Sequence, residues 1–141
     1  MKEFEIIPKN GVGPIKLGMS RADVESCFGI PEFDNGTRIG YMSGYFIDFD
    51  AENNVEFIEL SNSDEFKITY SGVDLHNVDA MGVISLIEGD DNYDRSDPEI
   101  GYSYVFKRIG LSLWRGTIPE GVEDTDGKYF EAIGVAIEGY F

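Results

Sequence analysis

The segment Tyr45-Phe46-Ile47-Asp48-Phe49, followed closely by Val55-Glu56-Phe57-Ile58-Glu59-Leu60, decides the fold of this chain. Side chains of a β-strand point alternately to opposite faces of the sheet. The residues Tyr45, Ile47 and Phe49 alternate with their neighbours at this period of two, which predicts a strand with one buried and one wetter face. The intervening Glu52-Asn53-Asn54 has the composition of a turn, so the two segments are expected to form a hairpin.

Further strands are expected on both sides of this hairpin. Apolar runs broken by Gly and Pro between residues 4 and 17 indicate a short strand, a turn and a second short strand. The other expected strands share high contents of aromatic and β-branched residues. They span residues 66–70, 102–106, 109–115 and 129–137.

Two short helices are expected, one in each half of the chain. Ser20 is a good N-cap for the segment that follows it, Gly29 suits a left-handed C-terminal residue, and Pro31 prevents continuation. In the second half, Asn77 or Asp79 caps a helix that runs through residues 80–87 and ends at Gly89.

The order of these elements predicts an α+β domain, an antiparallel sheet with two short helices on one face. A helix followed by hairpins occurs in each half, which suggests two helix–hairpin repeats. The length of 141 residues fits a single domain over residues 1–141. A chain of this length buries enough surface to fold without a disulfide or a structural metal.

The charge of the chain favours some partners and disfavours others. Its 11 Lys and Arg against 27 Asp and Glu give a net charge of −16. Nucleic-acid phosphates and anionic membranes both need basic contacts, so neither is expected as a partner, whereas a basic protein is. The N-terminus lacks the basic and apolar regions of a signal peptide, so we expect a cytoplasmic protein. The sequence does not determine the oligomeric state.

A search for catalytic and cofactor motifs finds little. The lone histidine, His76, is near Asp79, but no serine or cysteine stands in a recognisable nucleophile motif. The lone cysteine, Cys27, is expected on the buried side of the first helix as a small hydrophobe. The glycines of residues 11–18 lack the ending of a P-loop. We therefore expect no catalytic residues, no cofactor and no metal.

Two acidic loops are the candidate partner-binding regions. Acidic side chains around an aromatic anchor suit capture of a basic protein surface, and the two loops are expected to share one rim. The candidate residues are Asp90, Asp91, Asp94, Asp97, Glu99, Glu120, Glu123, Asp124, Asp126 and the aromatic Tyr93. Trp114, in the middle of an expected strand, is assigned to the core.

The acidic residues of the first of these loops also suggest a calcium-binding site. An EF-hand started at Asp90 needs glycine at its sixth position and glutamate at its twelfth, where this chain has Arg95 and Gly101. A calcium site of irregular geometry is therefore kept as an alternative for this loop. The alternative function is thus a small ligand- or cation-binding domain, or a minor enzyme, that uses residues 90–99 and 120–126.

Two stretches resemble known families. Residues 15–24, ending near Gly29-Ile30-Pro31, resemble the opening of small repeat domains such as β-lactamase-inhibitor-like modules and outer-membrane assembly lipoproteins. Residues 102–115, with 128–134 and 139–141, are similar to small bacterial proteins encoded beside polymorphic toxins, including contact-dependent growth-inhibition systems. Together the stretches cover roughly half of the chain.

The second resemblance implies an immunity protein, a non-enzymatic inhibitor that binds a cognate toxin domain directly. Many such toxins are nucleases with basic surfaces, which an acidic inhibitor complements. The resemblance transfers no catalytic residues and no interface positions. It implies an acidic binding protein that neutralises a basic toxin.

Overall fold

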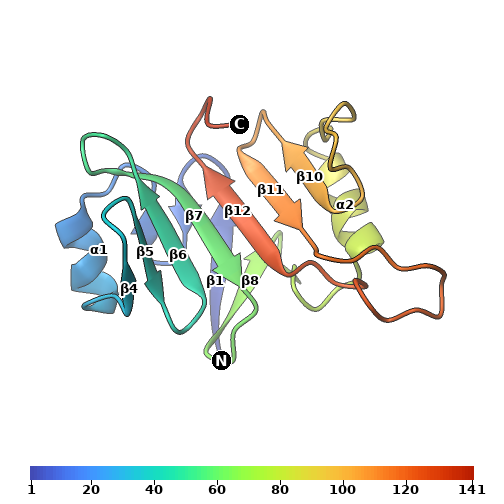
Figure 1. The fold of residues 1–141 in the computed structure, drawn as a ribbon, viewed down its shortest axis with the longest axis horizontal. Helices are drawn as coiled ribbons and strands as arrows, with labels where there is room; N and C mark the ends of the chain where they lie inside the picture. Colours follow the sequence, from blue (N-terminus) through green and yellow to red (C-terminus); the bar gives the residue numbers. More distant parts are fainter.

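The computed structural model describes residues 1–141 and contains two sheets. The larger sheet has seven strands: β4 (Phe33–Asp34), β5 (Arg38–Tyr41), β6 (Tyr45–Phe49), β7 (Val55–Ser61), β10 (Ser103–Phe106), β11 (Leu111–Trp114) and β12 (Ala132–Ala136). Their order across the sheet is β10-β11-β12-β7-β6-β5-β4, and every neighbouring pair is antiparallel (Figure 1). The expected β6–β7 hairpin is confirmed.

The smaller sheet has five strands and lies behind the larger one in Figure 1. Its strands are β1 (Lys2–Ile7), β2 (Gly11–Val12), β3 (Ile15–Lys16), β8 (Phe66–Tyr70) and β9 (Val73–Asp74), in the order β3-β2-β1-β8-β9. The structure has two sheets where a single antiparallel sheet was expected, and one pair of strands, β1 and β8, is parallel. The α+β class and the mostly antiparallel pairing are confirmed.

The helices are α1 (Arg21–Phe28) and α2 (Ala80–Glu88), which lie at opposite ends of the molecule (Figure 1). Oγ of Ser20 accepts the Asp23 N–H at 3.2 Å, and a carboxylate oxygen of Asp79 accepts the Gly82 N–H at 3.3 Å. The N-cap predictions are therefore confirmed, with Asp79 rather than Asn77 in the second helix. Neither helix has the length and apolar character needed to cross a bilayer.

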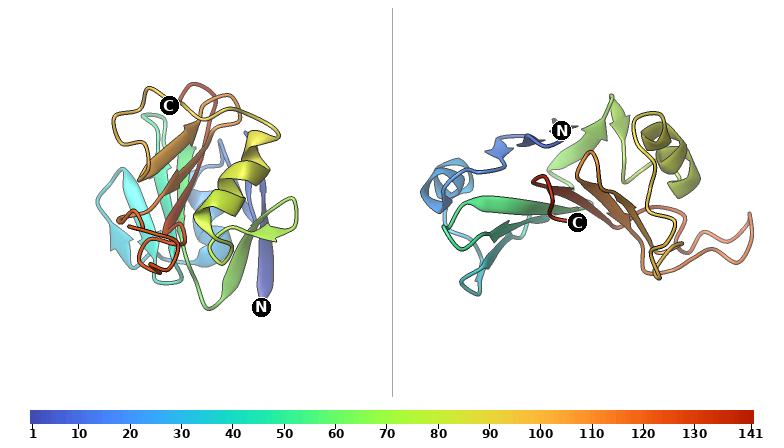
Figure 2. Two further views of the ribbon diagram at one scale, coloured as in Figure 1. Left: turned by 90° about the vertical axis from the view of Figure 1, so that its right-hand side faces the viewer. Right: turned by 90° about the horizontal axis from the view of Figure 1, so that it is seen from above.

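The core lies between the two sheets (Figure 2) and continues under both helices. Tyr45, Ile47 and Phe49 are buried, whereas Phe46 and Asp48 on the opposite face of β6 are only partly covered. The alternation predicted for this strand is confirmed. One cluster of buried hydrophobic side chains includes members from each sheet and each helix, so the two layers share a single core.

Two assignments to the interior are wrong. Cys27 is exposed, because α1 turns only Val24 fully into the core. Trp114 is 44% exposed. Its neighbours Leu111 and Leu113 are buried, and the period of two along β11 places Trp114 on the opposite face of the sheet.

Candidate functional site

The first acidic loop, residues 90–99, uses several of its carboxylates to hold its own structure. Asp91 accepts the backbone N–H groups of Arg108 at 3.0 Å and Ile109 at 3.3 Å. Asp90 accepts the Tyr70 hydroxyl at 2.5 Å. Burial and this bond raise the pKa of Tyr70 to about 12. Asp91 thus anchors the start of the loop to the turn between β10 and β11, and Asp90 anchors it to β8.

The middle of the first acidic loop is bonded in the same way. Asp94 accepts the hydroxyl of Ser96 at 2.6 Å, its N–H at 3.0 Å and the ammonium of Lys107 at 3.2 Å. These contacts, those with Ser96 foremost, lower the pKa of Asp94 to about 2. Asp97 accepts the Glu99 N–H at 2.9 Å. Among the acids of this loop, only Glu99 has a carboxylate that forms no hydrogen bond or ion pair with the protein.

Tyr93 is a packing residue. Its ring meets Tyr104 edge-on with centroids 5.0 Å apart, and Phe106 at 6.0 Å. The guanidinium of Arg95 covers it, 4.0 Å from the ring centroid. The ring is therefore already in contact with the protein on several sides, which limits the area that a partner would reach.

In the second acidic loop, residues 116–127, one acid is bonded to the backbone and three acids form no bond with the protein. Asp124 accepts the backbone N–H groups of Glu120 at 3.0 Å and Asp126 at 2.9 Å, and these bonds lower its pKa. The carboxylates of Glu120, Glu123 and Asp126 are exposed and form no hydrogen bond or ion pair with the protein. This loop holds three acids that are free to bind.

The two acidic loops meet only at one end. The start of the first loop is bonded at Arg108 and Ile109, whereas the second loop begins at Gly116, beyond the other end of β11. Near Gly101, the chain returns to the second loop, where the side chain of Ile118 lies against it. The acids near the start of the first loop therefore lie away from those of the second.

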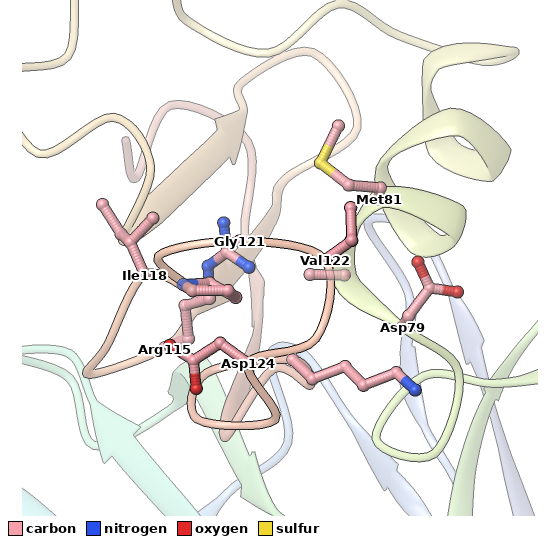
Figure 3. Close-up of a pocket in the computed structure, with 10 residues that line it drawn as sticks. Asp79, Met81, Arg115, Ile118, Gly121, Val122 and Asp124 are labelled. Carbon is pink, nitrogen blue, oxygen red and sulfur yellow. The ribbon is translucent and has the colours of Figure 1, made fainter.

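A cleft lies between the start of α2 and the second acidic loop (Figure 3). Its volume is about 430 Å³. Met81 from the helix and Ile118 and Val122 from the loop give it apolar walls, and all three side chains are exposed. Sequence reasoning missed this cleft, although two branched apolar residues in an otherwise polar, acidic loop were a signal for it.

Arg115 lines the cleft and is only 5% exposed. Its Nε donates to the Gly101 carbonyl at 2.8 Å, and its Nη1 donates to the Gly127 carbonyl at 3.0 Å. The guanidinium carbon lies 5.7 Å from the centroid of the Phe130 ring. Arg115 thus bonds the segment that follows the first acidic loop, at Gly101, and the end of the second acidic loop, at Gly127, a role that no sequence pattern indicated.

His76 does not form a pair with Asp79. His76 is 3% exposed, its Nε2 lies 3.2 Å from the Leu60 carbonyl, and Asp79 is occupied in capping α2. Burial lowers the pKa of His76, while the bond to Leu60 opposes the shift. His76 acts as a core residue that joins the smaller sheet to β7.

The lowered pKa of His76 predicts a pH-dependent stability. Between this pKa and the unfolded value of about 6.5, the unfolded chain binds more protons than the folded one. We therefore expect the free energy of unfolding to fall as the pH drops below about 6.5. Urea titrations at several pH values will measure this, with His76→Gln as the control that cannot titrate. Equal slopes in both proteins would contradict the prediction.

No group of three or more His, Cys, Asp or Glu side chains is placed to hold a metal ion. No protein-family model, no curated protein and no solved structure matches this chain. The features of the molecule that bear on its function are the second acidic loop, the cleft beside it and the charge of the chain.

Proposed function

We propose that this protein is an acidic, non-enzymatic binding protein that neutralises a cognate basic protein toxin by direct contact. The observation that carries the proposal is the second acidic loop. There, the free carboxylates of Glu120, Glu123 and Asp126 stand beside the exposed apolar side chains of Ile118 and Val122. Charge and apolar area occur together on one segment, as a protein-binding surface requires.

The two kinds of residue have different roles in this proposal. A net charge of −16 attracts a basic domain over a distance and raises the rate of encounter. Apolar contacts that lose their water on binding then slow dissociation. Val122 is fully exposed and Met81 is 62% exposed, so both offer area that a partner can cover. A nuclease with a basic substrate surface is the toxin class that this charge fits best.

The first acidic loop has a smaller part in the proposed interface. Asp91 and Asp94 hold backbone and side-chain groups of their own chain, so their loss would disturb the fold before it changed any interface. Glu99 lies near the point where the two loops meet, and its carboxylate is free. We place the centre of the interface on the second acidic loop, with Glu99 at its margin.

The test is co-expression with the toxin encoded beside this protein. We expect the intact protein to restore growth of cells that produce the active toxin, and the purified pair to elute as one complex. The matched control is a toxin already inactivated by mutation, with which growth is independent of this protein. Continued growth arrest with a verified toxin and a folded, expressed protein would overturn the proposal.

A small-ligand function is the second candidate, and the cleft favours it over a cation site. Both acidic loops were expected to take part in such a site, but in the first loop the carboxylates of Asp91, Asp94 and Asp97 accept hydrogen bonds from their own chain. The cleft instead combines apolar walls with a buried arginine.

A further inference from the structure

Arg115 differs from every other arginine in the chain. The remaining four form ion pairs with carboxylates within 4.0 Å; these are Arg21, Arg38, Arg95 and Arg108. Arg115 has no carboxylate partner although it is the most buried of the five and the protein carries 27 acids. A buried cation without a counter-ion is costly, so such a group points to a binding role.

One nitrogen of Arg115 is available for a ligand. Nε and Nη1 donate to the carbonyls of Gly101 and Gly127, and Nη2 donates to no atom of the protein. Every fully buried side-chain nitrogen and oxygen has a partner, so Nη2 must be in contact with solvent. Figure 3 shows the guanidinium directed into the cleft between Ile118 and Met81.

The acids that line the cleft form no ion pair with Arg115. Asp79 accepts the Gly82 N–H, and Asp124 accepts the N–H groups of Glu120 and Asp126. Lys128 also lines the cleft and has no carboxylate within ion-pair distance. The two cations of the cleft therefore form no ion pair with its two acids, whose carboxylates accept hydrogen bonds from backbone N–H groups instead.

The opposite wall of the cleft adds a further donor. Met81 lies in the first turn of α2, a helix of nine residues, and its backbone N–H has no acceptor in the protein. The first turn of a helix favours negative charge, because its N–H groups are unpaired and the helix dipole is positive there. The helix turn that carries Met81 therefore borders the cleft and has one backbone donor without an acceptor.

We propose that the cleft binds a small amphipathic carboxylate, with its carboxylate on Nη2 of Arg115 and its apolar chain against Met81, Ile118 and Val122. Carboxylates are preferred partners of guanidinium groups, and a bond between two charged groups is about twice as strong as a neutral one. The volume of about 430 Å³ is within the usual range for small-molecule sites. This inference does not depend on toxin binding.

The test is a titration of the isolated ¹⁵N-labelled protein with hexanoate at constant ionic strength, followed by NMR. We expect saturable shifts of the Arg115 Nε–H and the Met81 amide signals. Hexanamide has the chain without the charge, and acetate has the charge without the chain. Both should bind at least about tenfold more weakly than hexanoate. Equal binding of either compound, or no saturable shift at the cleft, would overturn the proposal.

Surface variants locate the site without disturbing Arg115. Val122→Asp places a negative charge at the wall of the cleft, on a fully exposed side chain, and should weaken hexanoate binding about tenfold. Ile30→Asp introduces the same charge at a position that is 87% exposed and does not line the cleft, and should leave binding unchanged. Equal affinities of the two variants would contradict binding at this cleft.

Discussion

Replacing Tyr45 with Ala is expected to lower the free energy of unfolding by about 3–5 kcal/mol. Tyr45 is completely buried and lies on β6 of the larger sheet. Its ring meets Phe4 and Phe66 of the smaller sheet, with centroids 6.4 and 5.9 Å away, and Phe28 of α1 at 4.9 Å. One side chain thus joins three elements, and its truncation leaves a cavity among all of them.

Denaturation in urea, followed by circular dichroism, measures this loss. Tyr45→Phe is the matched control, because it keeps the ring and removes only the hydroxyl that donates to the Val12 carbonyl. We expect this control to cost about 1–2 kcal/mol, since one buried carbonyl loses its partner. A Tyr45→Ala protein as stable as the control would contradict the position of this ring between the sheets.

The features of the fold that depend on nearby residues were predictable. The alternation around Ile47 and the caps at Ser20 and Asp79 each depend on interactions within a few residues, and the structure confirms them. The parallel pairing of β1 with β8 brings Lys2 beside Phe66, and no local pattern records such a distant pairing. A parallel pair needs a long crossover, which here contains most of the first half of the chain.

The acidic loops and the arginine that contacts them likewise combine local contacts with contacts between distant residues. Asp94, Asp97 and Asp124 each accept the N–H of the residue two positions further on, a recurrent turn geometry of aspartate. The sequence alone does not distinguish these structural acids from free ones, because Asp126 is also followed two positions on by a residue with an N–H and accepts no hydrogen bond. The burial of Arg115 was not readable, because its bonds reach carbonyls on two different loops that only the folded chain brings together.

Reversing the charge of the three free acids of the second acidic loop should have the largest effect on toxin binding. In the triple variant Glu120→Lys, Glu123→Lys and Asp126→Lys, we expect association with the cognate toxin to slow by about tenfold or more at low ionic strength. The three side chains are exposed and unbonded, so the fold should be unaffected. Stopped-flow or surface-binding kinetics over a range of salt concentrations measure the change.

The control reverses three other exposed and unbonded acids, Glu3, Glu52 and Asp64, and changes the net charge by the same amount. If only the overall field of the protein guides the toxin, both triple variants will slow association equally. If the second acidic loop forms the contact, its variant will also dissociate faster and show a weaker salt dependence, whereas the control will keep the original dissociation rate. Equal behaviour of the two variants would therefore move the interface away from this loop while leaving the electrostatic attraction in place.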